Sequence, residues 1–213
     1  MPMKKLSPLS RFTLAHFFEY QWAFLLVGAV VAALLFYYPI NAVNAYPSTE
    51  RLDAFFLVAE EKEPFLQSLA DPEGDIKEVR PYFYSPSTSN IGDVYTAYGV
   101  FADLLLLRDR EFEDVGEYVD EMAFALPDEI SSQISLPMYQ TAEGKSYGVK
   151  IYDGEDEAFN EAHRFLDWLD FASYEGSYYL VIGPESDNIA PYNGKSVNGG
   201  AFEALFAILE AYR

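Results

Sequence analysis

The most hydrophobic part of the chain is a long uncharged segment near its start. No charged residue lies between Glu19 and Glu50, and residues 22–38 are apolar or aromatic. The nineteen residues 22–40 would form a helix of about 29 Å, which matches the hydrocarbon thickness of a bilayer. Aromatic residues stand at both ends, as they do at the two membrane interfaces. We therefore predict a transmembrane helix over residues 22–40.

The charges that flank this segment predict its orientation. Lys4, Lys5 and Arg11 precede it, against a single acidic residue, so the positive-inside rule keeps the N-terminus in the cytoplasm. We expect a single-pass protein of the cell membrane, with the lipid bilayer as a partner and the C-terminal domain outside. The expected parts are a cytoplasmic segment (1–21), a signal-anchor helix (22–40), a linker (41–50) and an extracytoplasmic domain (51–213).

Two other interpretations of this segment stay open. Val43-Asn44-Ala45 fits the small-residue pattern that precedes a signal-peptide cleavage site, so the anchor could be cleaved after Ala45. The apolar segment exceeds the roughly 7–15 residues of a signal peptide, which favours an uncleaved anchor. A buried core helix is the third interpretation, although core helices rarely run this long without charge.

Beyond residue 50, short apolar runs alternate with segments of helical period. The runs predict strands, and Pro81 assigns the second of them to an edge or a bend. Residues 183–200 are rich in Gly, Pro, Asn and Ser, which predicts a long surface loop. The alternation predicts an α/β domain whose sheet is largely parallel, has about five strands and is flanked by helices. The expected strands are 55–58, 79–84, 102–107, 147–152 and 178–182, and the expected helices 63–69, 91–101, 115–126, 157–169 and 201–212.

Charge and composition narrow the classes of function. The chain has 34 acidic and 14 basic residues, and residues 50–213 alone hold 33 acidic and 11 basic ones, a net charge of −22. Such acidity argues against nucleic acid as a partner, because phosphates need Lys and Arg. The absence of cysteine excludes disulfides, a thiolate zinc site and a lipid-modified cysteine.

Several common catalytic and phosphate-binding motifs are missing from the sequence. It has no Gly-x-Ser-x-Gly, no phosphate-binding loop and no Gly-x-Gly-x-x-Gly, and His163 is the only histidine after the apolar segment. Asp71-Pro-Glu-Gly-Asp75 matches a calcium loop only in part, because its glycine is at the fourth position rather than the sixth. We therefore predict no catalytic residue, no metal site and no cofactor, and a protein that is not an enzyme.

Polar residues follow several of the expected strands. In a parallel sheet the carboxyl ends of the strands meet at one edge, where polar or anionic ligands bind. The alternative interpretation is ordinary capping and turn chemistry. The candidate ligand-binding residues are Ser85, Ser87, Thr88, Ser89 and Asn90 after the second strand, Arg108 and Arg110 after the third, and Ser186 and Asn188 after the last.

Two stretches resemble parts of bacterial extracytoplasmic solute-binding proteins. They are Phe101-Ala-Asp-Leu-Leu-Leu-Leu107, which an acidic helix follows, and Glu143-Gly-Lys-Ser-Tyr-Gly-Val149. In addition, Phe17-Phe-Glu-Tyr-Gln-Trp22 is similar to the start of small uncharacterised single-pass bacterial membrane proteins. Solute-binding proteins have two lobes, whereas this chain has room for about one. The resemblance implies a one-lobed binding fold outside the membrane.

Three functions are consistent with these patterns. The leading expectation is a non-catalytic, membrane-anchored domain that binds a small polar ligand or a partner protein, including a role as a transport accessory. One alternative is a tethered or secreted hydrolase that works with carboxylates. The other is a structural subunit of a membrane complex, because the spacing of Gly28 and Ala32 permits close approach of a second helix.

Overall fold

The computed structural model describes residues 26–33, 35, 45–85, 91–171, 176–194 and 196–213. Residues 26–33 are helical, but the rest of the predicted transmembrane segment lies almost entirely outside the described residues, as does the predicted cytoplasmic segment 1–21. Within the described ranges, no helix has both the length and the apolar character that crossing a bilayer requires. Tyr46–Arg213 forms one compact unit.

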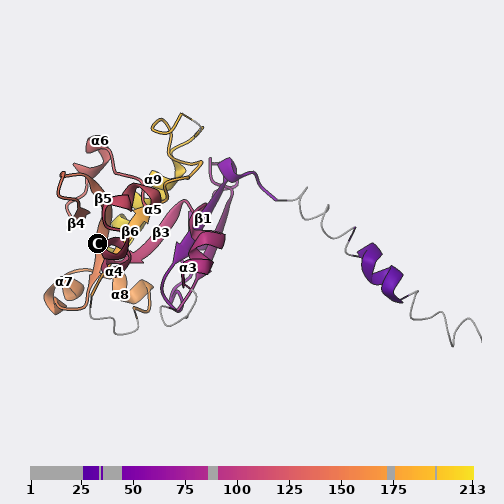
Figure 1. Cartoon of the computed structure of the whole chain (residues 1–213), viewed down its shortest axis with the longest axis horizontal. Coiled ribbons are helices and arrows are strands. Elements are labelled where there is room, and N and C mark those ends of the chain that lie inside the picture. The colour runs from indigo at the N-terminus through magenta and orange to yellow at the C-terminus, as the bar shows by residue number, and fades with distance from the viewer. Residues whose placement is uncertain (1–25, 34, 36–44, 86–90, 172–175, 195) are drawn as a thin grey trace, which may run out of the picture. The chain divides into compact units, whose positions relative to one another are not determined.

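A six-stranded mixed sheet runs through this unit (Figure 1). Its order is β2-β1-β3-β6-β5-β4; β1 pairs parallel with β2 and β3, and the remaining pairs are antiparallel. The α/β class is confirmed, but the prediction of a largely parallel sheet is wrong. The strands are β1 (Arg51–Phe56), β2 (Glu78–Phe83), β3 (Leu104–Arg108), β4 (Met138–Gln140), β5 (Ser146–Asp153) and β6 (Ser177–Ile182).

The antiparallel half arises from a hairpin that the apolar pattern does not reveal. β4 has three residues and is half-exposed, so it carries no hydrophobic period. It pairs with β5 through a turn in which Gly144 has φ +84°, a conformation that glycine adopts without strain. An apolar run indicates that a strand is buried on both faces, but it does not encode the direction of the strand.

Helical segments are short, apart from the last. The predicted helix over 201–212 is confirmed as α9. The helix predicted over 115–126 is reduced to α5, because Gly116 has φ +53° and Ala123 has an extended backbone. His163 has an extended backbone and separates α7 from α8. The segments are η1 (Ser48–Glu50), η2 (Leu66–Leu69), α3 (Ile91–Val94), η3 (Tyr95–Gly99), α4 (Asp109–Val115), η4 (Gly116–Tyr118), α5 (Val119–Met122), α6 (Asp128–Ser131), α7 (Glu157–Ala162), α8 (Phe165–Trp168) and α9 (Gly200–Tyr212).

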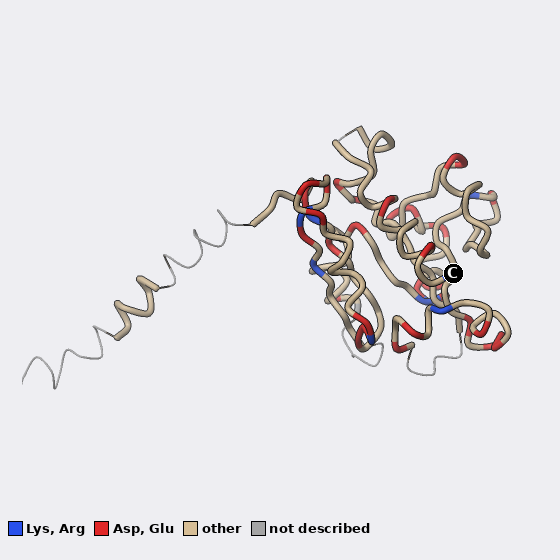
Figure 2. The backbone as a smooth tube through the Cα atoms, turned by 180° about the vertical axis from the view of Figure 1, so that it is seen from behind, with Lys and Arg blue, Asp and Glu red and all other residues tan. Residues whose placement is uncertain are grey.

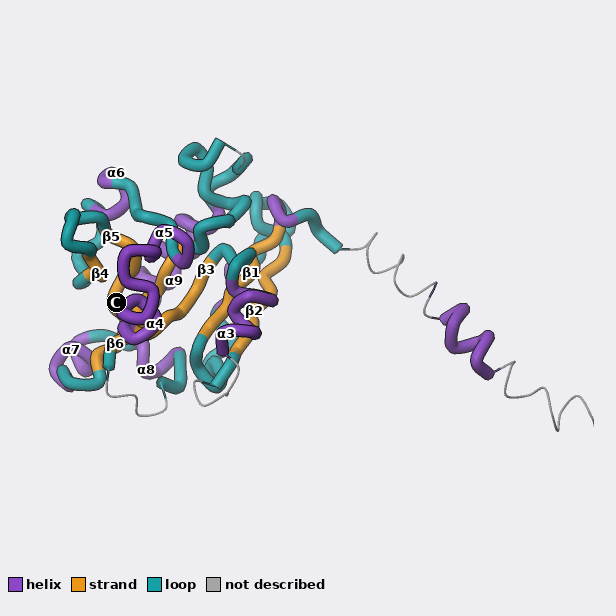
Figure 3. The backbone as a smooth tube through the Cα atoms, viewed as in Figure 1, coloured by secondary structure: helices purple, strands orange, loops and turns teal. Residues whose placement is uncertain are grey.

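Helical segments cover both faces of the sheet (Figure 3). Successive residues of β1 point to opposite faces. The ring of Phe55 lies 6.0 Å from Tyr95 of η3, and the ring of Phe56 lies 5.7 Å from Trp168 of α8. Trp168 in turn stacks on Tyr212 of α9 at 5.2 Å. The core is therefore divided between two helix–sheet layers.

The edge position predicted for the strand with Pro81 is confirmed, because β2 ends the sheet. The N–H of Tyr84 donates to the carbonyl of Phe56 at 2.9 Å, whereas the carbonyl of Val79 accepts from the side chain of Gln67 at 3.1 Å. In a parallel pair, alternate residues direct their backbone groups to the same neighbour. In β2, Tyr84 therefore directs its backbone groups to β1, whereas Val79 and Pro81 direct theirs away from β1. The N–H that Pro81 lacks would not have formed a bond between the strands.

Candidate functional site

The sheet has two ends that carry different groups. We call the end with the first residues of β1 and β3 the proximal end, and the opposite one the distal end. Because β6 is antiparallel to β3, its last residue, Ile182, pairs with Leu104 at the proximal end. The predicted site residues are thus divided: Ser85, Arg108 and Arg110 lie at the distal end, and Ser186 and Asn188 at the proximal end. Ser87, Thr88, Ser89 and Asn90 lie outside the described residues.

The two predicted arginines are held by acidic residues of their own helix. Arg108 is buried and forms a short ion pair with Glu111, whose carboxylate also accepts from the backbone N–H of Arg108 at 2.8 Å. This reciprocal contact caps the start of α4. Arg110 is exposed and lies 3.7 Å from Asp114. The geometry of Arg108 is that of a structural ion pair rather than of a group presented to a ligand.

Ser186 and Asn188 are buried around the carboxylate of Asp103, which the sequence indicated only as part of the stretch 101–107 that resembles solute-binding proteins. One oxygen of Asp103 accepts from the Ser186 hydroxyl at 2.6 Å and from the Asn188 amide at 2.9 Å. The other accepts from the backbone N–H of Asp53 at 2.8 Å. Burial raises the pKa of Asp103 from 3.8 to about 6. These four residues, the Asp103 network, connect β1 and β3 to the loop after β6.

A glycine allows this loop to begin so close to β3. The N–H of Gly183 donates to the carbonyl of Asp103 at 2.9 Å. A Cβ at this position would lie 1.8 Å from the carbonyl oxygen of Ala102, far inside van der Waals contact. Only glycine fits this close approach of two backbones, which places the start of the loop beside β3.

A crevice of about 360 Å³ lies elsewhere, between the η4–α5 segment and the β4–β5 hairpin. We call it the hairpin crevice. Its size is at the lower end of the range of small-ligand pockets, roughly 300–1,000 Å³. Its lining combines aromatic, acidic, basic and amide side chains: Gly116, Glu117, Val119, Asp120, Tyr139, Gln140, Thr141, Ala142, Glu143, Lys145 and Tyr147.

One wall of the hairpin crevice carries a fixed polar cluster. The Tyr147 hydroxyl donates to one carboxylate oxygen of Asp120 at 2.6 Å, and the Lys145 ammonium donates to the other at 3.2 Å. The hydrogen bond from Tyr147 lowers the pKa of Asp120, and Asp120 in turn raises the pKa of Lys145. Burial, followed by the contact with Asp120, raises the pKa of Tyr147. Near neutral pH the cluster therefore holds a carboxylate, an ammonium and a neutral phenol.

These groups remain within reach of solvent. The side chains of Asp120 and Lys145 are 60% and 47% exposed, while Tyr147 is buried beneath them. The ring of Tyr139 stacks on Phe112 at 4.2 Å and meets Tyr179 edge-on at 5.7 Å, which fixes its orientation. A carboxylate with a lowered pKa is a poor general acid.

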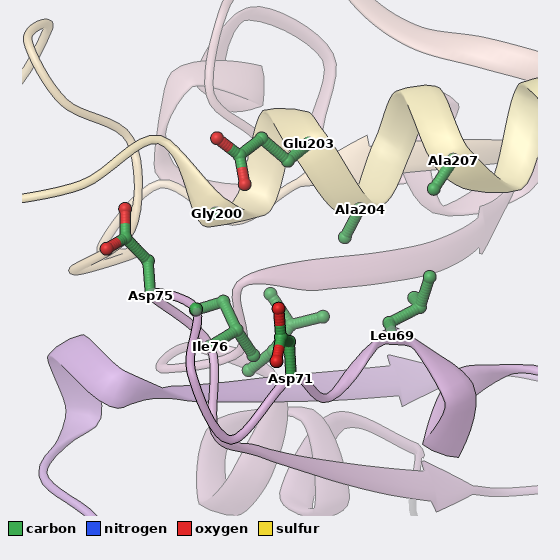
Figure 4. Close-up of a pocket in the computed structure, with 10 residues that line it drawn as sticks. Leu69, Asp71, Asp75, Ile76, Gly200, Glu203, Ala204 and Ala207 are labelled. Atoms are coloured by element: carbon green, nitrogen blue, oxygen red, sulfur yellow. The ribbon is translucent and has the colours of Figure 1, made fainter.

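A second, smaller hollow of about 180 Å³ lies beside the start of α9 (Figure 4). Its acidic residues are Asp71 and Asp75, from the loop before β2, and Glu203, from the first turn of α9. Gly200 lets the start of α9 lie against Ile76, because a Cβ at position 200 would lie 2.5 Å from the Ile76 side chain. Within the described part of the chain, no group of three or more His, Asp or Glu residues could hold a metal ion.

The sequence did not indicate the members of the hairpin crevice as a site. Asp120 lies 25 residues from Lys145 and 27 from Tyr147, and only the fold brings the three together. The only signal was the Gly-Lys-Ser-Tyr-Gly stretch, which the resemblance covers. Comparison of the chain with protein-family models, with curated proteins and with solved structures finds no match. The resemblance to solute-binding proteins stays a prediction.

Proposed function

We propose that this chain is a single-pass, membrane-anchored extracytoplasmic domain that binds a small polar ligand in the hairpin crevice and is not catalytic. The observation that carries the proposal is the cluster of Asp120, Lys145 and Tyr147. It offers an exposed acceptor and an exposed donor, fixed by a buried phenol, on the wall of a preformed crevice. Such preorganisation lowers the cost of ordering side chains when a ligand binds.

The membrane anchor is supported by the sequence alone. The uncharged segment 22–40 is long enough to span a bilayer, and basic residues precede it. The compact unit begins at Tyr46, a few residues after this segment. Protease treatment of intact cells tests the topology: we expect the acidic domain to be digested. Survival of the domain until the cells are lysed would contradict it.

Binding is tested on the full chain in lipid nanodiscs, by ligand-observed NMR against a panel of neutral and cationic small molecules that can donate hydrogen bonds to the Asp120 carboxylate. We expect at least one class to bind, and Asp120→Asn to weaken that binding. The matched control is Asp167→Asn, because Asp167 forms an exposed ion pair with Arg164 elsewhere on the domain. Equal loss in both variants, or binding that neither variant changes, would contradict a role for the hairpin crevice.

The hydrolase alternative is favoured by one observation, the three carboxylates around the hollow beside α9. It predicts turnover of a glycoside or ester panel that Glu203→Gln abolishes while the melting temperature is unchanged. Turnover with this behaviour would replace the binding proposal. Crosslinking in intact membranes tests the structural-subunit alternative, which predicts a stoichiometric protein partner.

A further inference from the structure

Three separate parts of the chain each contribute a carboxylate to the hairpin crevice. Glu117 belongs to η4, Asp120 to α5, and Glu143 to the turn between β4 and β5. Among the described residues that line the crevice, Lys145 is the only basic one. With these side chains ionised, the lining has a net charge of −2. The sign of this charge bears on which molecules the crevice can bind.

The one positive charge of the lining is already neutralised within the protein. The Lys145 ammonium donates to Asp120 at 3.2 Å, while Tyr147 donates to the other oxygen of the same carboxylate. In the described part of the chain, neither Glu117 nor Glu143 forms an ion pair, and both residues are exposed. The crevice therefore presents two negative charges without a basic partner, and these repel an anion and attract a cation.

The surroundings of the crevice add to its negative potential. Burial, followed by the negative charge of Glu113, raises the pKa of Tyr139, whose ring lines the crevice. Figure 2 shows many acidic and few basic positions along the compact unit, and residues 50–213 have a net charge of −22. A cleft that is lined by charges of one sign raises the local concentration of ions of the opposite sign.

The aromatic wall and the size of the crevice favour an organic cation over a metal ion. Tyr139 and Tyr147 belong to the lining, and the face of an aromatic ring attracts cations. The same aromatic group already holds one cation, because the Lys150 ammonium lies 5.9 Å from the centre of the Tyr179 ring, which contacts Tyr139. A volume of about 360 Å³ corresponds to roughly twelve water molecules at about 30 Å³ each, which is the size of a small molecule rather than of a bare ion.

We propose that the hairpin crevice binds a small organic amine in its protonated form, held by the carboxylates of Asp120, Glu117 and Glu143. This inference rests on the proposed function of the crevice and names the class of its ligand. Lys145 then competes with the ligand, because its ammonium occupies the carboxylate that the ammonium of the ligand needs. Removing the charge of Lys145 should strengthen the binding of an amine, whereas it would weaken the binding of a molecule that accepts a hydrogen bond from Lys145.

The experiment compares amines with alcohols of similar size. Benzylamine is paired with benzyl alcohol, and putrescine with butanediol; the amines are protonated at neutral pH and the alcohols are neutral. Each probe is titrated by ligand-observed NMR into the full chain in phosphatidylcholine nanodiscs, whose headgroups carry no net charge. The variants are Lys145→Met, Glu143→Gln and Asp120→Asn. The matched control for Lys145→Met is Arg164→Met, because Arg164 forms an exposed ion pair with Asp167 elsewhere on the domain.

We expect at least one amine to bind about 10-fold or more tightly than its alcohol, because charge-assisted hydrogen bonds are the stronger ones. Its affinity should rise several-fold in Lys145→Met, fall in Glu143→Gln and stay unchanged in Arg164→Met.

Three results would overturn the inference. An alcohol that binds as tightly as its amine, and that loses affinity in Asp120→Asn, overturns the amine class and leaves the hairpin crevice as a binding site. Amine binding that Lys145→Met weakens overturns the competing role of Lys145 and the inference with it. If neither amine binds, the inference fails, and the wider panel decides whether the crevice binds any ligand. If Lys145→Met lowers the melting temperature, Glu143→Gln and the comparison of amine with alcohol give the decisive readings.

Discussion

Replacing Asp103 by asparagine tests how the loop after β6 is held. The carboxylate accepts three hydrogen bonds, and all three come from N–H or O–H donors. An amide has one acceptor oxygen, so Asp103→Asn must turn its NH₂ group toward at least one of these donors. Hydrogen bonds to a charged group contribute about 1.5–3 kcal/mol, so we expect a loss of about 2 kcal/mol in the free energy of unfolding at pH 7.

The same substitution has a predicted pH dependence. Burial raises the pKa of Asp103 from 3.8 to about 6, so the folded state binds a proton more tightly than the unfolded state. This group therefore adds stability at low pH, and the contribution is lost as the pH rises through about 6. By the linkage relation, this group raises the free energy of unfolding of the wild-type protein by about 2 kcal/mol when the pH falls from 7 to 4.5. The deficit of Asp103→Asn should grow to about 4 kcal/mol at pH 4.5.

Urea unfolding of residues 46–213, followed by the fluorescence of the buried Trp168, measures both numbers. Comparing the variant with the wild-type protein at each pH cancels the titration of the other carboxylates. The control is Asp93→Asn, because Asp93 is exposed in α3. A deficit that stays constant from pH 7 to pH 4.5 would refute the account of the Asp103 network.

Three further substitutions test the fold and the crevice. Gly183→Ala should prevent cooperative unfolding in circular dichroism, because its Cβ would meet a backbone carbonyl oxygen at 1.8 Å. The control Gly92→Ala should leave the melting temperature nearly unchanged, because no atom lies within 4 Å of its Cβ. Trp168→Ala should cost about 3–5 kcal/mol in urea unfolding followed by circular dichroism, because it empties a fully buried site. A loss below about 1 kcal/mol would contradict this packing. In Asp120→Asn, the Tyr147 phenol should titrate at lower pH than in the wild-type protein, because a carboxylate that raises its pKa is gone. An unchanged ultraviolet titration would contradict that contact.

The sequence predicted the strands better than the way they pair. Leu104 to Leu107 and the apolar run before Ile182 identify two buried strands, and both are present. Their antiparallel pairing depends on long-range contacts and on the β4–β5 hairpin, and Gly144 was the only local sign of that hairpin. The helical segments break at Gly116 and His163, where the backbone leaves the helical conformation. The amphipathic pattern of side chains continues across both positions, so it does not reveal the breaks.

The candidate site was harder to predict for a related reason. Ser186 and Asn188 are polar residues that follow a strand, and ligand-binding loops show the same pattern. Their hydrogen bonds to Asp103 can be predicted only when the direction of that strand is known. Asp120 and Lys145 are ordinary charged residues in the sequence. Their shared position on the crevice arises only when the hairpin folds back toward α5.

The proposal that the hairpin crevice is a binding site is tested most directly by one comparison of affinities. The best ligand from the panel is titrated into the full chain, into Asp120→Asn and into Asp167→Asn. Loss of one charge-assisted contact predicts an affinity about 10- to 100-fold lower for Asp120→Asn and an unchanged affinity for the Asp167→Asn control. If no molecule of the panel binds, or if Asp120→Asn binds as tightly as the wild-type protein, the hairpin crevice is not the site.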